Sequence, residues 1–280
     1  MKIAVIGSGT MGAGIAQVLA SKHEVILRDV VKEALDRAMN TITKSLDKSV
    51  SKGRITEDDK NTVLNNIKIS DNIEDVKDCD LVIEAATENP EIKKNIFKEL
   101  SEVCDPKTIL ASNTSSLSIT DIAASTNRAD KVIGMHFFNP VPVMKLVEVI
   151  NGQKTSPEVT ETIVKLSEEV GKTPVKVEEG PGFVVNRILV PMINEAAGIY
   201  AEKLASAEDI DTAMKLGANH PMGPLALGDL IGLDVVLAIM EVLYREFGDP
   251  KYRPHPIIKK MVRAGQLGRK TKVGFYDYNK

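Results

Sequence analysis

Short runs of apolar and β-branched residues alternate with longer amphipathic segments along the first two thirds of the chain. The runs are KIAVIG, EVILRD, IKIS, DLVIEA, TILASN, KVIGMHFF, MKLVEVI and TPVKV. A short apolar run bounded by polar residues or glycine is typical of a buried strand. Because helical patterns separate these strands, the sequence predicts a largely parallel sheet that is covered by helices.

The pattern changes after the GPG sequence at residues 180–182. The segments 183–206 and 229–247 are rich in apolar residues, have the length of helices and lack the alternation of strands. The sequence therefore predicts two domains, an α/β domain over residues 1–181 and an all-helical domain over residues 182–280.

Charge and cysteine content narrow the class of protein. The formal net charge is -3, so no overall basic field attracts nucleic acid, and an anionic ligand needs a local cluster of cations. Cys79 and Cys104 lack the spacing of a zinc site or a disulfide framework, and we expect both in the core of a protein from a reducing compartment. No apolar stretch approaches the roughly 20 residues of a membrane span, and a strand directly after Met1 leaves no room for a signal peptide. We therefore expect a cytoplasmic protein that binds neither membranes nor nucleic acid.

A glycine-rich loop follows the first strand. Gly7, Gly9 and Gly12 stand in the sequence G-S-G-T-M-G, before the apolar helical pattern AGIAQVLA. In dinucleotide-binding folds these glycines make a tight turn, let the backbone approach the pyrophosphate and let the helix pack closely on the strand. Thr10 and Met11 would then lie at the phosphate end of the helix. A glycine turn without a ligand is the alternative.

The second strand ends at Asp29, about 20 residues after the loop, where a carboxylate can bind the ribose hydroxyls of a dinucleotide. The loop and this carboxylate together predict a Rossmann-type sheet with NAD as the cofactor. Asp29 would repel the 2′-phosphate of NADP, although the adjacent Arg28 leaves NADP open.

Histidine is the usual group that exchanges a proton when an alcohol is oxidised near neutral pH. His136 follows the strand KVIGM, near a strand end where α/β sheets bind ligands, whereas His23 and His255 are expected at the surface. Glu148 lies in the next apolar strand, where an unpaired carboxylate is costly. Its natural partner is His136, which it would orient and stabilise as an imidazolium. The alternatives for Glu148 are an ion pair with Lys145 and a water-facing position on an edge strand.

Three further polar residues are candidates for the site. Ser115 and Ser116 follow the strand TILASN, where they could hydrogen-bond a substrate oxygen or cap the next helix. Asn186 falls in the first turn of the helix after GPG. Its amide could face a ligand or make a contact between the domains.

These motifs together resemble a known family. G-S-G-T-M-G, ATEN, SNTSSLSIT, GMHFFNPVPVMKLVEVI and GPGFVVNR, in this order, strongly resemble the L-3-hydroxyacyl-CoA dehydrogenases, and in particular their short bacterial members. The resemblance extends through KTKVGFYDY and so covers essentially the whole chain. It implies reversible NAD(H)-dependent reduction of a 3-oxoacyl-CoA, with acetoacetyl-CoA favoured, to the (S)-3-hydroxyacyl-CoA.

The resemblance also implies roles for individual residues. His136 would be the general base in oxidation and the general acid in reduction, supported by Glu148. Ser115 would contact the substrate near the nicotinamide, and Asn186 would help to bind the thioester or 3-oxo oxygen. No metal is implied. The other residues that would line the cofactor pocket are Asn139, Glu88 and Lys93.

An acyl-CoA is strongly anionic, so a slightly acidic protein must bind it with local cations. The helical segment after Asp29 has an apolar stripe and, roughly opposite, a basic one. This arrangement fits the insertion that holds CoA in the resembled family, while a solvated helix face is the alternative. The apolar positions are Leu35, Met39, Ile42 and Leu46. The basic stripe includes Lys44, and the candidates for CoA contact are Lys48, Lys52 and Arg54.

Two other functions compete with this one. A dehydrogenase of free hydroxyacids or sugar acids would use the same His136 and Glu148 without needing the basic stripe. A dinucleotide-binding sensor would bind NADH without turnover. The resemblance further implies a homodimer, and the apolar residues between 227 and 239 exceed one helix stripe, so either the domain core or a partner would cover them.

Overall fold

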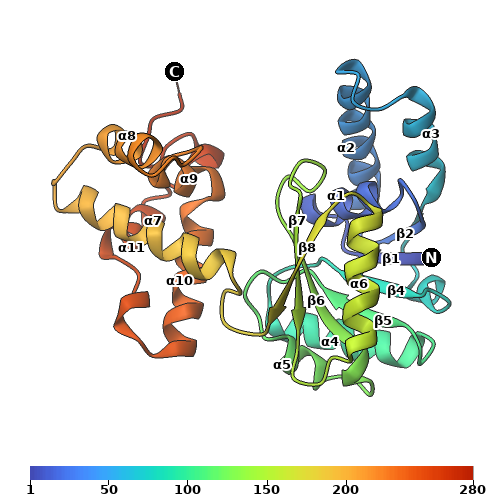
Figure 1. Ribbon diagram of the computed structural model, residues 1–280. Helices are drawn as coiled ribbons and strands as arrows, with labels where there is room; N and C mark the ends of the chain where they lie inside the picture. The colour runs from blue at the N-terminus through green and yellow to red at the C-terminus, as the bar shows by residue number, and fades with distance from the viewer. Residues whose placement is uncertain (280) are drawn as a thin grey trace. The chain divides into compact units, whose positions relative to one another are not determined.

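The computed structural model describes residues 1–279 and divides into two compact units, Met1–Gly180 (unit 1) and Pro181–Lys280 (unit 2). Unit 1 is built on one eight-stranded sheet with the strand order β3-β2-β1-β4-β5-β6-β7-β8 (Figure 1). Neighbouring strands are parallel except β6 and β7, so β7 and β8 run opposite to the rest. The strands are β1 (Lys2–Ile6), β2 (Glu24–Arg28), β3 (Ile67–Ser70), β4 (Leu81–Glu84), β5 (Ile109–Ser112), β6 (Val132–Phe137), β7 (Leu146–Asn151) and β8 (Thr173–Glu178).

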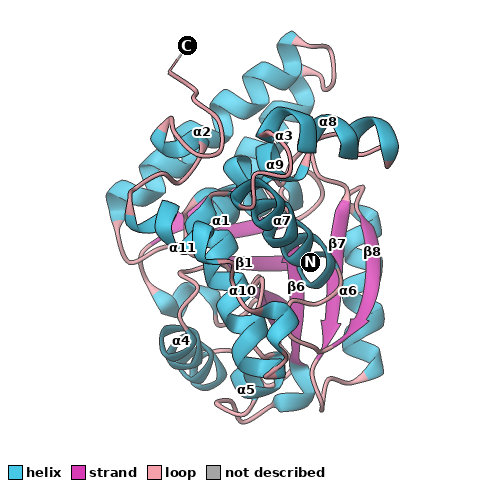
Figure 2. Cartoon of the chain, turned by 90° about the vertical axis from the view of Figure 1, so that its left-hand side faces the viewer, coloured by secondary structure: helices cyan, strands magenta, loops and turns pink. Residues whose placement is uncertain are grey.

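Burial along the strands explains the continuous apolar runs in the sequence. Every residue of β4, β5 and β6 is buried, as expected for strands whose two faces are both covered. The edge strand β8 is mostly exposed. Figure 2 shows β6, β7 and β8 side by side at one end of the sheet. All predicted strands are present, and the predicted largely parallel α/β fold is confirmed.

The helices of unit 1 begin where the sequence provides caps. Asn89 and Ser156 accept hydrogen bonds from the first turns of α4 and α6, each of which starts with proline. The helices α2 and α3 form an insertion between β2 and β3 (Figure 1). The helices are α1 (Thr10–Leu19), α2 (Lys32–Ser51), α3 (Glu57–Asn66), α4 (Pro90–Val103), α5 (Ile119–Ala123) and α6 (Pro157–Glu169), with 3-10 turns at Ile73–Val76 and Ala129–Lys131.

Unit 2 is helical, as predicted, apart from isolated bridges at Gly268, Val273 and Asp277. The expected helical segment 229–247 contains a break at Gly232, whose φ of 102° is accessible to glycine but strained for other residues. The helices are α7 (Val185–Ala201), α8 (Ala207–Gly217), α9 (Pro224–Ile231), α10 (Leu233–Phe247) and α11 (Pro256–Arg263), with 3-10 turns at Pro250–Tyr252 and Arg269–Thr271.

Two buried carboxylates hold the end of the described chain onto unit 2. Asp229 accepts hydrogen bonds from the backbone of Phe275 and Tyr276 at 3.0 Å each. Asp211 accepts one from the Tyr276 hydroxyl at 2.8 Å and caps the first turn of α9. Burial raises the pKa of Asp229 above its ordinary value.

The two thiols are buried, and two of the histidines are half-buried. Cys79 and Cys104 are buried, as expected, and burial raises the pKa of each thiol to about 11. The expected surface positions of His23 and His255 are wrong, because both are half-buried. His255 caps α11 and hydrogen-bonds through its backbone to Asn194, so its role is structural. Within residues 1–279, every helix is too short or too polar to cross a membrane.

Candidate active site

The glycine loop has the geometry of a phosphate-binding turn. Gly7 has a φ of 99°. A Cβ at Gly12 would lie 1.8 Å from the carbonyl oxygen of Gly7, so only glycine lets α1 pack this closely on the loop. A Cβ at Gly9 would meet no atom within 4 Å, so the backbone there is open to a ligand. Gly9 also precedes the first turn of α1, which has no side-chain cap for its N–H groups.

Asp29 is held at the end of β2 by the same loop. The backbone N and the Oγ of Ser8 both donate to Asp29 Oδ2 at 2.7 Å. Burial by itself raises the pKa of this carboxyl, but the hydrogen bonds from Ser8 and Val31 outweigh it and lower the pKa below its ordinary value. Asp29 is therefore ionised at neutral pH.

A cavity of about 750 Å³ borders this loop, within the usual range of ligand sites. We call it the dinucleotide cavity. Its open backbone at Gly9, the uncapped end of α1 and the ionised Asp29 suit a pyrophosphate and a ribose, so these residues fit NAD. The predicted residues that line the cavity are Gly7, Gly9, Thr10, Met11 and Asp29, together with the apolar side chains of Ile6, Val30, Ile92 and Ile96.

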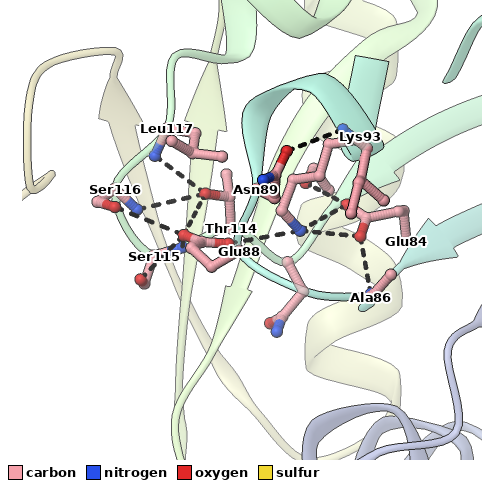
Figure 3. Close-up of polar contacts among 12 residues, drawn as sticks. Glu84, Ala86, Glu88, Asn89, Lys93, Thr114, Ser115, Ser116 and Leu117 are labelled. Atoms are coloured by element: carbon pink, nitrogen blue, oxygen red, sulfur yellow. Dashed lines mark hydrogen bonds and ion pairs between the residues drawn. The ribbon is translucent and has the colours of Figure 1, made fainter. Parts of the chain in front are cut away.

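A charged network lies between the ends of β4 and β5. Figure 3 shows Lys93 of α4 reaching toward Glu84 and Glu88. Lys93 is 1% exposed, and its Nζ lies 2.8 Å from Glu84 Oε1 and 3.4 Å from Glu88 Oε2. Glu84, which is completely buried, also accepts hydrogen bonds from the Ala86 backbone and from Ser112. Sequence reasoning missed Glu84, although a carboxylate that ends an apolar strand is a signal that a cation lies nearby.

Glu88 collects the hydrogen bonds of the loop after β5. Its Oε1 accepts from Thr114 Oγ1 at 2.6 Å and from the backbone N and Oγ of Ser115 at 2.8 and 3.1 Å (Figure 3). Burial raises the pKa of Glu88, but the Lys93 ammonium and these hydrogen bonds outweigh it and hold the pKa below its ordinary value. The cap of α5 is Ser118 rather than Ser115 or Ser116, so the capping alternative for those two residues is wrong.

His136 and Glu148 form a buried pair on neighbouring strands. The antiparallel register of β6 and β7 places them directly opposite each other. His136 Nδ1 lies 2.8 Å from Glu148 Oε2, and the two residues are 6% and 1% exposed. The alternatives for Glu148, pairing with Lys145 or facing water, are therefore wrong. A carboxylate at Nδ1 fixes the orientation of the imidazole ring.

The surroundings of this pair include one residue that sequence reasoning missed. Asn113 Oδ1 accepts a hydrogen bond from the Phe137 backbone at 2.8 Å and so ties the end of β5 to that of β6. The rings of Phe138 and His136 lie 4.4 Å apart at a tilt of 48°. Asn139 follows and is exposed. Asn186 is the second residue of α7, in unit 2.

A second cavity of unit 1 is strongly basic, with a volume of about 790 Å³. All three predicted CoA candidates line it, beside residues from the turns before β7 and β8. Its lining contains six cations and one carboxylate, Asp59, so it suits a polyanionic ligand. Three of the cations were missed because they are distant in sequence from the basic stripe. The cations are Lys48, Lys52 and Arg54 from the stripe and its turn, and Lys22, Lys145 and Lys172 from elsewhere. Among residues 1–279 no cluster of side chains could hold a metal ion.

Comparison with known proteins places these features in a family. The family model described as "3-hydroxyacyl-CoA dehydrogenase, NAD binding domain" matches residues 2–180, and that of the "C-terminal domain" matches residues 182–278. The chain is 64% identical to a 3-hydroxybutyryl-CoA dehydrogenase of Clostridioides difficile, with 100% of both chains covered. It is 54% identical to a probable 3-hydroxybutyryl-CoA dehydrogenase of Bacillus subtilis, over 99% of this chain and 97% of that one.

Solved structures agree. The crystal structure of (S)-3-hydroxybutyryl-CoA dehydrogenase from Ralstonia eutropha matches with a TM-score of 0.96 and 52% identity, over 100% of this chain and 99% of that one. Both the sequence and the fold therefore match over the full length of the chain. The chain belongs to the 3-hydroxyacyl-CoA dehydrogenase family and is an NAD-dependent dehydrogenase.

Proposed function

We propose that the enzyme interconverts a short-chain 3-oxoacyl-CoA and the (S)-3-hydroxyacyl-CoA, with acetoacetyl-CoA and 3-hydroxybutyryl-CoA as the favoured pair. The relatives named for 3-hydroxybutyryl-CoA support this substrate. The observation that carries the proposal is the contact of 2.8 Å between His136 Nδ1 and Glu148 Oε2 inside an NAD-dependent dehydrogenase. This geometry supplies the proton transfer that alcohol oxidation requires.

His136 acts as the general base in oxidation. When bound, NAD accepts the hydride from the alcohol carbon and, as NADH, returns it in the reverse direction. His136 Nε2 removes the hydroxyl proton as the alcohol becomes a ketone, and Glu148 stabilises the resulting imidazolium. In reduction the same nitrogen donates that proton to the keto oxygen. Because both side chains are almost fully buried, their attraction is little screened by water.

The cofactor residues divide between two regions of unit 1. Gly7, Gly9 and Asp29 hold the adenosine diphosphate half in the dinucleotide cavity, and ionised Asp29 favours NAD over NADP by repelling a 2′-phosphate. Glu88 and Ser115 approach the nicotinamide half. Lys93 acts through Glu88 and not directly on the cofactor, because the Lys93 ammonium is buried against Glu84. Asn139 completes the proposed cofactor set, and Asn186 of α7 keeps a proposed role as a ligand of the substrate carbonyl.

The basic cavity is the proposed site for the phosphates of CoA. Lys48, Lys52 and Arg54 are exposed side chains along its wall, free to reach a polyanion. A dehydrogenase of free hydroxyacids has no use for such a surplus of positive charge, so the cavity favours a CoA ester.

We also propose a homodimer in the cytoplasm. Unit 2 exposes several large apolar side chains, as expected of a surface that a partner covers. The two buried free thiols suit a reducing compartment. The most exposed of these apolar residues are Leu216, Leu204 and Ile188.

The test compares the initial rate of NADH oxidation with acetoacetyl-CoA as substrate and the rate with free acetoacetate as substrate. We expect rapid, CoA-dependent turnover. In His136→Gln, kcat should fall by about 10²- to 10⁴-fold while NADH still binds. Efficient use of free acetoacetate would favour the free-acid dehydrogenase, and NADH binding without turnover by the wild type would favour the sensor. Replacing Lys48 and Lys52 with methionine should raise KM for the CoA ester only.

A further inference from the structure

One lysine in the wall of the basic cavity differs from the others. Lys172 is only 8% exposed, whereas Lys48, Lys52 and Lys145 are exposed. Its Nζ donates hydrogen bonds to the carbonyl oxygens of Val141 and Met144, at 2.6 and 2.8 Å. No carboxylate pairs with this ammonium among residues 1–279.

A buried ammonium whose partners are neutral is costly. Two of its three N–H groups reach carbonyl dipoles, which stabilise a positive charge less than a carboxylate does. Lys93 shows the usual solution, because both oxygens of Glu84 lie within 2.9 Å of its Nζ. Burial lowers the pKa of Lys172, and no anionic group of the protein offsets this effect. An anionic ligand in the cavity would supply the missing counter-charge.

The two carbonyls that Lys172 contacts belong to the turn between β6 and β7. These are the strands that carry His136 and Glu148. Val141 is buried against α1, where a Cβ added at Gly14 would lie 2.9 Å from the Val141 Cβ. The turn is therefore packed on one side and held by the ammonium on the other. Residues of the same turn that line the basic cavity are Pro140, Pro142 and Val143.

We propose that Lys172 is a specificity-determining residue whose buried ammonium binds a phosphate of the acyl-CoA while it holds the turn between β6 and β7. The inference rests on the acyl-CoA function proposed above. A thioester that lacks the phosphates of CoA leaves this ammonium without its anion. Lys172 therefore discriminates between a CoA ester and a shorter thioester with the same acyl group.

The first experiment compares acetoacetyl-CoA with S-acetoacetyl-pantetheine, which has the same reacting atoms and no adenosine phosphates. In Lys172→Met we expect KM for the CoA ester to rise about tenfold, the loss of one charge-assisted contact, with kcat within about threefold. For the pantetheine ester, kcat/KM should change less than about threefold. Lys165→Met, which removes a charge from the exposed face of α6 outside the cavity, is the matched control and should change neither. An equal loss with both thioesters would mean that Lys172 only supports the turn, and no loss with either would mean that it binds no phosphate. Both results overturn the proposal.

A second experiment uses the wild-type protein and requires no turnover. The NMR signal of the Lys172 ammonium can be identified by its absence in Lys172→Arg. We expect adenosine 3′,5′-bisphosphate to shift this signal and adenosine to leave it unchanged. If the bisphosphate does not shift the signal, the proposal is overturned. If inorganic phosphate at the same concentration shifts the signal equally, the assignment of the bound phosphate to CoA is overturned. If the wild type fails to reduce acetoacetyl-CoA, the proposed function fails while this binding test still decides on Lys172.

Discussion

Unit 1 contains two buried pairs, each of a basic side chain and a carboxylate, that look alike in geometry and differ in chemistry. His136 and Glu148 are 2.8 Å apart, and Lys93 and Glu84 are also 2.8 Å apart. All four residues are less than 10% exposed, and each pair joins two adjacent elements of the fold. An imidazole exchanges its proton near neutral pH, whereas a lysine ammonium beside carboxylates stays charged. Geometry alone would therefore not tell a catalytic pair from a structural one.

The residues around each pair also separate the proposed catalytic pair from the structural one. In the Lys93–Glu84 pair, Glu84 also accepts hydrogen bonds from Ala86 and Ser112, and Lys93 contacts a second carboxylate, that of Glu88. The His136–Glu148 pair lies near the strand ends, at the edge where α/β sheets bind ligands. One pair can transfer a proton, and the other can only hold a charge in place. We therefore propose that the first pair is catalytic and that the second supports Glu88.

The largest effect should come from breaking the proposed catalytic pair, His136 and Glu148. Glu148→Gln keeps the shape of the side chain but cannot stabilise an imidazolium, so we expect kcat to fall by about 10²-fold or more, with little change in NADH affinity. Initial rates with acetoacetyl-CoA measure this. Glu178→Gln, the same substitution on the exposed strand β8, is the control and should keep kcat within about twofold. If the two variants behaved alike, Glu148 would have no part in proton transfer.

The structural pair should respond in stability instead. Lys93→Met leaves the fully buried Glu84 without its cation, and breaking a buried pair in this way costs about 3–5 kcal/mol of the free energy of unfolding. The double variant Lys93→Met/Glu84→Gln removes both charges and should recover part of that loss. Urea unfolding followed by circular dichroism gives both values. A double variant less stable than Lys93→Met would show that Glu84 does not depend on this cation.

The sequence predicted one of these pairs and missed the other for a physical reason. A lone histidine and a lone glutamate in two consecutive apolar strands have few partners but each other, and the antiparallel pairing of the two strands places them opposite. Glu84 ends its strand, and its partner is on the next helix. That pairing depends on how α4 packs over β4, which hydrophobic periodicity does not report.

The same limit applies to the two cavities and to unit 2. The glycine loop and Asp29 are local in sequence, so the dinucleotide cavity could be predicted. The basic cavity could be predicted only in part, because Lys145 and Lys172 reach it through the tertiary fold. The break between α9 and α10 was missed because it depends on the backbone conformation of one residue, Gly232, inside an apolar segment.

The smallest predicted effect tests whether the Lys93 network acts through charge. The pKa of Glu88 is lowered in the folded protein, so its contribution to stability is fully present above the ordinary glutamate value of 4.5 and is lost as the pH falls through the lowered value. The difference in unfolding free energy between wild type and Glu88→Gln should therefore shrink as the pH falls below the ordinary value of 4.5, from about 1 kcal/mol or less, since Glu88 is partly exposed. For Asp229 we expect a pH dependence of stability with the opposite sign. Its raised pKa means that the folded protein binds the proton more tightly, so the stability of wild type relative to Asp229→Asn should rise as the pH falls. Urea unfolding at several pH values measures both slopes, and slopes of the same sign would mean that one of the two carboxylates is not held as described.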